Sequence, residues 1–411
     1  NSDEWIYDFL NCLNPSHKSV KPLSELILYF RGKGHFNSAE SDRLITAYHN
    51  MIEDHLKPKY RKLRDFLKNE YLPKSRNTSG LGSLPGGLET YRYLIRLHTT
   101  SNLTIDEIHK KGLKEVDRIL AEMEKAKARM GFSGDIKDFF EFIRNSPEQM
   151  PFTEPNQVID HFNDIKLQVK NSLSSLFSLE PKATFEVRRT EAFREASASA
   201  EYVPGSKDGS RSGIFYVPIP NVLHYNKYAD EALFLHEAIP GHHYQLSLQQ
   251  ENKQLPEFLH PESLGVFVEG WALYAESLGG ELGLYQDPVQ YFGMLSMEMH
   301  RAIRLVVDTG IHGKGWTREQ AIQYSLDHEA ESEAAIISEI ERYMATPGQA
   351  LSYKIGQLKI QELRSKATRI LGDKFNIKEF HDQVLNAGSL PLVILEKKIN
   401  NWINSKMITK M

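Results

Sequence analysis

The chain has 411 residues, which is long enough for a large buried core and for two or three domains. Charged residues make up 25% of the sequence and the formal net charge is −4, so neither nucleic acid nor an anionic membrane surface is indicated as a partner. Cys12 is the single cysteine, which excludes an intrachain disulfide and a thiolate-rich metal site.

No apolar run is long enough to span a bilayer, and the most apolar region contains Glu262, Glu269 and Glu276. The sequence begins with Asn1 rather than Met, so we expect that a signal peptide or an N-terminal region has been removed. The expected location is periplasmic or otherwise extracytoplasmic if a signal peptide was removed, and cytoplasmic if not.

Most of the chain is predicted to be helical. Thr104 and Thr317 each begin a capping box that marks a helix start, and residues 75–87 are rich in Ser, Gly and Pro. This stretch predicts a loop, either a linker or an active-site loop. Apolar residues recur at helical spacing over residues 44–66, 105–130, 158–176, 321–343 and 358–371.

One region favours strands instead of helices. Residues 184–188 and 212–217 are rich in strand-forming side chains, and residues 204–209 between them are typical of a turn. We therefore expect a small sheet at about 184–217. Its exposed edge could hold an extended peptide through main-chain hydrogen bonds. A purely structural hairpin beneath the helices is the alternative.

Three histidines and a glutamate crowd the next segment, from His236 to His243. His236 and Glu237 begin like the His-Glu-x-x-His motif of zinc peptidases, in which two imidazoles lie one helical turn apart beside a carboxylate. Pro240 occupies the position of the second histidine. The alternative to a reshaped zinc site is a kinked core helix that ends in polar histidines.

Helix geometry decides which histidine is the better partner for His236. On an unbroken helix His242 lies on the far side, and His243 lies on the same face about 10 Å further along. Both ligand nitrogens must lie about 2.0–2.1 Å from one zinc, so neither fits. Pro240 breaks the helix, because it lacks an N–H group and its ring clashes with the preceding turn. If residues 239–241 bulge outward, His242 becomes the ligand, and His243 contacts substrate or a supporting carboxylate.

The apolar segment that follows the motif supplies a third ligand. Glu269 and Glu276 lie seven residues apart and therefore on one helix face. We assign Glu269 to the metal and Glu276 to holding a histidine N–H group, with a solvated glutamate as the alternative for Glu276. Zinc held by His236, His242 and Glu269 keeps one position open for water. Glu237 is then the general base that takes the proton of this water.

Four polar residues on a later helix share one face: Arg301, Arg304, Asp308 and His312. The intervening residues are apolar, so these side chains form either a buried ion network or a wall of the site, and both can be true. We also consider His312 as a second donor to the oxyanion.

Tyr353 is the main candidate donor for the developing oxyanion, with an ordinary packing role as the alternative. Arg304, Arg342 and Lys354 are candidates for holding a peptide carboxylate, which would indicate a carboxypeptidase. Nothing in the sequence selects among these three cations.

The chain resembles the bacterial family called domain of unknown function 885 (DUF885), a zinc-metallopeptidase-like group. The resemblance runs from about Leu84 to near the C-terminus, and family members are usually longer at the N-terminus. More distantly, the chain is similar to helical zinc carboxypeptidases and oligopeptidases, from which the inserted Pro-Gly pair is a departure. The matching segments are residues 236–245, 269–276, 304–312, 315–321, 347–356 and 380–385.

This resemblance implies a mainly α-helical, bilobed fold with a deep channel and a small β-sheet beside the metal helix. Residues 1–80 would form an N-terminal helical region, truncated relative to the family, and residues 81–411 the zinc-hydrolase domain. The expected function is zinc-dependent hydrolysis of peptides, as a carboxypeptidase or an oligopeptidase. The alternatives are a zinc amidase that acts on a non-peptide amide and an inactive peptide-binding protein. Retention of Glu237 argues against the latter, because a structural zinc site needs no base.

Overall fold

The computed structural model describes residues 27–28, 31–260 and 264–408, so Cys12 lies outside the described residues. It is 68% helix and 3% strand, which confirms the expected mainly α-helical fold with a small sheet. The chain divides into two compact units. The first comprises the described residues up to Asn77 together with Ala192–Arg194, and the second comprises the rest of the chain.

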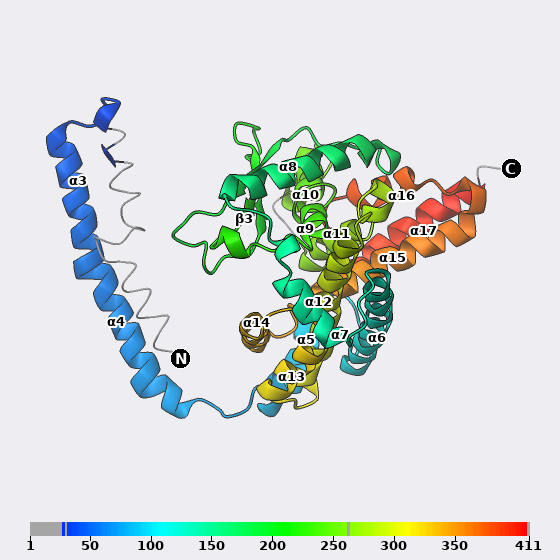
Figure 1. The fold of residues 1–411 in the computed structure, drawn as a ribbon, viewed down its shortest axis with the longest axis horizontal. Helices are drawn as coiled ribbons and strands as arrows, with labels where there is room; N and C mark the ends of the chain where they lie inside the picture. Colours follow the sequence, from blue (N-terminus) through cyan, green and yellow to red (C-terminus); the bar gives the residue numbers. More distant parts are fainter. Residues whose placement is uncertain (1–26, 29–30, 261–263, 409–411) are drawn as a thin grey trace. The chain divides into compact units, whose positions relative to one another are not determined.

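The first unit is helical almost without interruption from residue 38 to residue 74. Its helix α3 (Ser38–Asn50) begins at a capping box, in which Asn37 Oδ1 accepts from the Glu40 N–H group and Glu40 Oε2 accepts from the Asn37 N–H group, both at 2.9 Å. Helix α4 (Lys57–Phe66) follows after a π-helical turn (Figure 1). The predicted helix over residues 44–66 is therefore confirmed.

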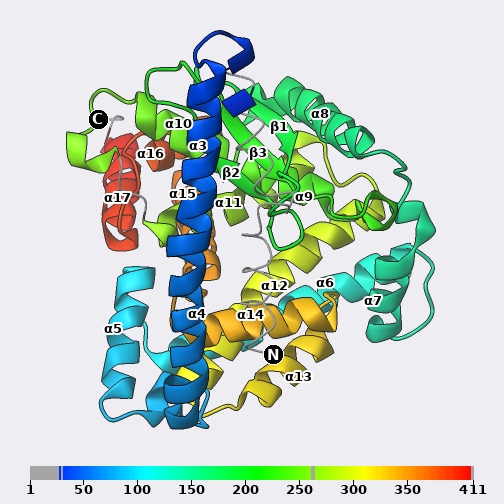
Figure 2. The ribbon, with the colours of Figure 1, turned by 90° about the vertical axis from the view of Figure 1, so that its left-hand side faces the viewer.

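The second unit contains the remaining helices and the sheet (Figures 1 and 2). The main helices before residue 230 are α5 (Gly87–Thr99), α6 (Ile105–Arg129), α7 (Ile136–Asn145) and α8 (Pro155–Ser172). Those that follow are α9 (Asp230–Glu237), α10 (His242–Glu251), α11 (Gly265–Glu276), α12 (Pro288–Gly313), α13 (Arg318–His328), α14 (Glu333–Ala345), α15 (Leu351–Leu371), α16 (Ile377–Leu385) and α17 (Leu392–Ile408).

Most helix predictions for this unit are confirmed, including the capping boxes at Thr104 and Thr317. The segment 321–343 differs, because it contains two helices instead of one. Helix α13 ends at His328, and the side chain of Ser332 caps the start of α14 by accepting from the Ala335 N–H group. Apolar spacing continues across this break, so the periodicity alone does not reveal it.

The sheet has three strands in the order β1 (Phe185–Arg189), β3 (Gly213–Val217) and β2 (Glu201–Val203). Strand β1 pairs with β3 in parallel, whereas β2 pairs with β3 in antiparallel fashion. The two strands expected from the sequence are therefore parallel neighbours, and the hairpin is formed by β3 and the unexpected strand β2. Helix α8 lies along β1 and α10 lies near β2 (Figure 2).

Two large hydrophobic cores hold the second unit together. One lies between the sheet and helices α8, α9, α11, α16 and α17, and its fully buried side chains include Phe162, Phe234 and Trp271. The other lies between α6, α7, α12 and α14, and includes Phe139 and Phe292. Helices α9 and α12 contact each other, so residues on these two helices meet where the two cores meet.

Helices α11 and α15 cross with their backbones in direct contact. A Cβ atom on Gly356 would lie only 2.0 Å from the Val266 carbonyl oxygen and 2.7 Å from Gly270 Cα. Only glycine leaves room for this approach. Because Glu269 directly precedes Gly270, the crossing also determines where the Glu269 side chain begins.

We predict that Gly356→Ala lowers the free energy of unfolding by roughly 2 kcal/mol or more, because the added methyl group forces α11 and α15 apart. Gly280→Ala is the matched control, since a Cβ atom there meets nothing within 4 Å. The control should change stability by less than about 1 kcal/mol. Urea denaturation followed by circular dichroism measures both, and equal stabilities of the two variants would contradict the prediction.

Candidate metal centre

The segment around Pro240 is a complete break between two helices. Helix α9 ends at Glu237, α10 begins at His242, and the connection contains a cis peptide bond between Ile239 and Pro240. The structure thus replaces the expected bulge within one helix by two separate helices. The proline ring cannot continue α9, because it lacks an N–H group and clashes with the preceding turn.

Gly241 allows α10 to start directly against the end of α9. A Cβ atom at this position would lie 2.0 Å from the His236 carbonyl oxygen and 2.2 Å from that of Leu235. The Trp271 indole N–H group on α11 donates to the Pro240 carbonyl oxygen at 2.7 Å and holds the connection in place. As a result, the rings of His236 and His242 lie 4.7 Å apart between centroids, at an interplanar angle of 88°.

The two imidazoles converge on Glu269 of α11. Its Oε2 atom lies 3.6 Å from His236 Nε2 and 3.5 Å from His242 Nε2. Within the part of the chain that the structure describes, these three residues form the one group of metal-binding side chains, with ligand atoms within 4.8 Å of one another. The two distances exceed ordinary hydrogen-bond lengths of about 2.7–3.2 Å. They approach the ~3.3–3.4 Å that separates two ligands held 2.0–2.1 Å from a tetrahedral zinc.

Glu276 orients the His236 ring from the opposite side. The Nδ1–H group of His236 donates to Glu276 Oε1 at 2.7 Å, and the glutamate is only 2% exposed, so it is not a solvated surface residue. This bond leaves Nε2 as the nitrogen that faces Glu269. A carboxylate behind a metal-binding histidine is the usual arrangement in zinc sites. The Glu269 side chain is 22% exposed, so the cluster is open to solvent on its side. The donor set, its spacing and this opening fit a zinc ion with one free coordination position.

Glu237 lies next to the cluster in sequence and is not one of the three converging side chains. It is buried, and burial raises the pKa of its carboxyl group.

His243 turns away from the cluster toward the sheet. Its Nδ1 atom lies 2.9 Å from the hydroxyl group of Tyr202 on β2, and its ring packs 4.4 Å from the ring of Phe185 on β1. Burial lowers the pKa of His243 to about 4, so the imidazole is neutral at ordinary pH. The sequence alone does not single out Tyr202, because nothing distinguishes one tyrosine in a short strand from the others.

The C-terminal part of the polar face of α12 is buried against other parts of the protein. Asp308 accepts hydrogen bonds from the Tyr91 hydroxyl group at 2.5 Å and from the Gly348 N–H group, and His312 is fully buried. His312 Nδ1 accepts from the Leu81 N–H group at 3.0 Å, and its Nε2 lies 3.0 Å from the Tyr343 carbonyl oxygen. Both ring nitrogens are engaged with backbone groups, so the expected catalytic role of His312 is not supported.

Lys354 is also removed from the candidates for substrate binding. It is fully buried, and its Nζ atom lies 2.7 Å from Glu298, 2.8 Å from Gln357 and 3.1 Å from Glu115. This network joins α6, α12 and α15 inside the protein. A lysine with three buried partners is not available to a substrate carboxylate.

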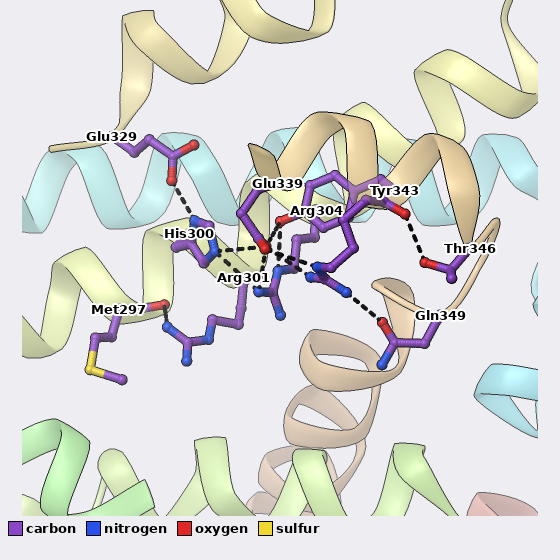
Figure 3. A network of polar contacts seen from close by, with 10 residues as sticks. Met297, His300, Arg301, Arg304, Glu329, Glu339, Tyr343, Thr346 and Gln349 are labelled. Carbon is purple, nitrogen blue, oxygen red and sulfur yellow. Dashed lines mark hydrogen bonds and ion pairs between the residues drawn. The ribbon is translucent and has the colours of Figure 1, made fainter. Parts of the chain in front are cut away.

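Arg304 and Arg342 both donate to Glu339 of α14, and Figure 3 shows Arg304 beside Glu339. Arg304 Nε donates to the Tyr343 hydroxyl group at 2.9 Å, its Nη2 donates to Glu339 at 3.0 Å, and its guanidinium group lies 4.5 Å from the centroid of the Tyr353 ring. Glu339 was missed in the sequence, although it lies three residues before Arg342, a spacing typical of helix ion pairs.

Tyr353 lies on α15, one helical turn before the glycine at which this helix crosses α11. Tyr353 therefore lies close to the crossing of α11 and α15, and Arg304 of α12 contacts its ring.

The comparisons with known proteins agree on the fold and are silent on activity. A family model described as bacterial protein of unknown function, DUF885, matches residues 11–399, and no curated protein matches the sequence. The crystal structure of a candidate lipoprotein from Colwellia psychrerythraea has a TM-score of 0.92 and 32% identity, and the alignment covers 98% of this chain and 69% of that one. A candidate lipoprotein of unknown function from Shewanella oneidensis has a TM-score of 0.68 and 21% identity, over 92% of this chain and 69% of that one. The described helices of this chain include none with the length and apolar character needed to cross a bilayer.

We predict that His242→Ala removes bound zinc from the metal-loaded protein, whereas His243→Ala retains it. The two substitutions remove the same side chain from adjacent buried positions, but only His242 faces Glu269. Zinc content per chain, measured by inductively coupled plasma mass spectrometry after dialysis, distinguishes them. If the His243→Ala protein loses zinc and the His242→Ala protein retains it, the proposed ligand set is excluded.

We also predict that Glu276→Gln lowers zinc affinity about 10-fold or more, because the His236 ring loses a charged acceptor for its Nδ1–H group. Glu281→Gln serves as the control, since Glu281 is exposed and pairs with Arg364 instead. Competition with a fluorescent chelator measures both affinities. Equal affinities for the two variants would show that Glu276 does not support the site.

Proposed function

This chain belongs to the DUF885 family of bacterial proteins, and we propose that it is a zinc-dependent peptide hydrolase. The observation that carries the proposal is the convergence of His236, His242 and Glu269, with the buried Glu237 directly after His236 in the chain. Two imidazoles, one carboxylate ligand and an adjacent carboxylate base are the parts that metal-assisted amide hydrolysis requires.

Each residue has a distinct task in this reaction. Zinc, when bound, supplies a Lewis acid that polarises a carbonyl group and lowers the pKa of a water molecule from 15.7 to about 7. Glu237 accepts the proton of the attacking water on a carboxylate oxygen and then donates it to the nitrogen of the leaving amine. Glu276 keeps the His236 ring in the tautomer that presents Nε2 to the site.

Tyr353 is the proposed donor to the oxyanion that develops on the substrate carbonyl. Its ring is held against the Arg304 guanidinium group, and its hydroxyl group has no hydrogen-bond partner among the described residues. Arg304 thus restricts the orientation of the ring through a cation–π contact.

A peptide is the substrate class that the surroundings favour. Strand β2 is an edge strand, and the contact between Tyr202 and His243 ties it to α10. An edge strand is the kind of element to which an extended peptide adds through main-chain hydrogen bonds. A zinc amidase would use the same chemistry on a non-peptide amide, and a binding protein with structural zinc would have no use for Glu237.

We predict that Glu237→Gln lowers kcat by about 100-fold or more and leaves zinc content unchanged. Glutamine preserves the size of the side chain but cannot accept the proton of water. Activity is measured on a mixed peptide library by mass spectrometry, with Glu281→Gln as a control that should retain wild-type activity. Activity of the Glu237→Gln protein near the wild-type level would exclude this residue as the base. If the zinc-loaded wild type cleaves no peptide but cleaves a member of a defined amide panel, the amidase replaces the peptidase.

A further inference from the structure

Two arginines of α12 have nitrogen atoms without partners. Arg301 and Arg304 lie one helical turn apart and next to each other in Figure 3. Arg301 Nε and Arg304 Nη1 are buried, and neither atom has a hydrogen-bond partner within residues 27–28, 31–260 and 264–408. Buried donors are nearly always paired, and a guanidinium group stays charged at every ordinary pH, so each of these two atoms is a donor that a bound anion could satisfy.

The rest of the Arg304 side chain is firmly held. Its Nε and Nη2 atoms donate to Tyr343 and Glu339, and the residue is only 7% exposed. The free Nη1 atom is therefore not a flexible end that has missed its partner. Arg301 is held more loosely, through one bond of 3.3 Å from Nη1 to the Met297 carbonyl oxygen.

These arginines lie on α12, which packs against α9, the helix that carries His236 and Glu237. Arg304 also contacts the ring of Tyr353, the proposed donor to the oxyanion. Arg301 also lines a cavity of about 430 Å³ together with Leu233. Leu233 lies one helical turn before Glu237 on the same face of α9, so the cavity is bounded by the turn of α9 that precedes Glu237.

We propose that Arg301 and Arg304 bind the terminal carboxylate of a peptide, which makes the chain a carboxypeptidase and not an endopeptidase. This inference rests on the proposed function, because it places the C-terminal end of the same substrate. The planar guanidinium group matches the two oxygens of a carboxylate. Asp230 and Glu331 line the same cavity, and their carboxyl groups disfavour an anion of higher charge, such as phosphate.

The structure also distinguishes Arg304 from Arg342, which the sequence left as equal candidates for binding a peptide carboxylate. Arg342 donates through Nε and Nη2 to Glu339 and through Nη1 to Gln349, so each of its nitrogens already has an acceptor. Only Arg304 of that pair retains a free buried donor.

Binding without turnover is the first test. Zinc-loaded Glu237→Gln protein is titrated with three fluorescent peptides of one sequence: a free acid, its amide, and an amide that ends in Asp. We expect the free acid to bind about 10- to 100-fold more tightly than either amide. This factor corresponds to one hydrogen bond between charged groups, which the amides cannot form with the arginines through their C-terminal end. Equal binding of the free acid and the plain amide overturns the proposal. Equal binding of the free acid and the Asp amide overturns the assignment to the chain terminus.

Variants connect this preference to the two arginines. Arg304→Gln and Arg301→Gln, each added to Glu237→Gln, should abolish the preference for the free acid. Arg318→Gln should retain it, since Arg318 pairs with Glu341 at the surface. Arg304→Gln leaves Glu339 with one partner fewer, so the half-buried Arg301 provides a variant that does not depend on that network. A preference that survives in both variants overturns the proposal.

Cleavage by the zinc-loaded wild type separates this inference from the proposed function. Release of C-terminal residues from the free acid, with the amide cleaved at least 10-fold more slowly, supports both. Equal cleavage of the acid and the amide keeps the hydrolase and overturns the carboxylate site. If neither the acid nor the amide is cleaved, but binding of the acid still depends on the arginines, the carboxylate site is supported and the hydrolase is overturned.

Discussion

Gly241 packs so closely against the last turn of α9 that no side chain fits between them, and the arrangement of the candidate site depends on this approach. The backbone turns back at Pro240, the Trp271 indole holds the turn from α11, and α10 begins with His242 beside His236. The same helix α11 carries Glu269 and Glu276. One short connection and one helix therefore position the converging donors and the carboxylate that supports them.

The two hydrophobic cores explain why these contacts are rigid. Trp271 and Phe234 belong to the core beneath the sheet, and Phe292 of α12 belongs to the other core. The candidate site is therefore built from helices that are each anchored by large buried side chains. The glycine crossing of α11 and α15 adds a contact with no adjustable side chain, because it joins backbone to backbone. Rigid surroundings of this kind keep ligand atoms in place before a metal binds, which lowers the free-energy cost of forming the site.

Charged residues of α12 serve two different purposes along one helix. Near its C-terminal end, Asp308 and His312 are completely engaged with buried groups, so they stabilise the packing of α12 against its neighbours. One turn earlier, Arg304 is oriented by Glu339 and Tyr343 and yet retains an unpaired donor. A protein that needed only stability would pair such an atom or replace it, since an unpaired buried donor costs about 1–3 kcal/mol. This contrast separates groups that build the fold from groups that face a ligand.

The sequence by itself determined the helical class, most helix positions, the location of the sheet, and the preference for His242 over His243 as the partner of His236. Those inferences depend on local physics: apolar periodicity, capping, and the inability of Pro240 to continue a helix. The tertiary structure decided the parallel pairing of β1 and β3, the complete break between α9 and α10, and the different environments of Arg304, Arg342, Lys354 and His312. Whether a charged side chain is satisfied depends on partners far away in the chain, such as Glu298 for Lys354 and Leu81 for His312. Periodicity along one helix identifies the face on which a side chain lies, but only the packing of the other helices determines what meets it there.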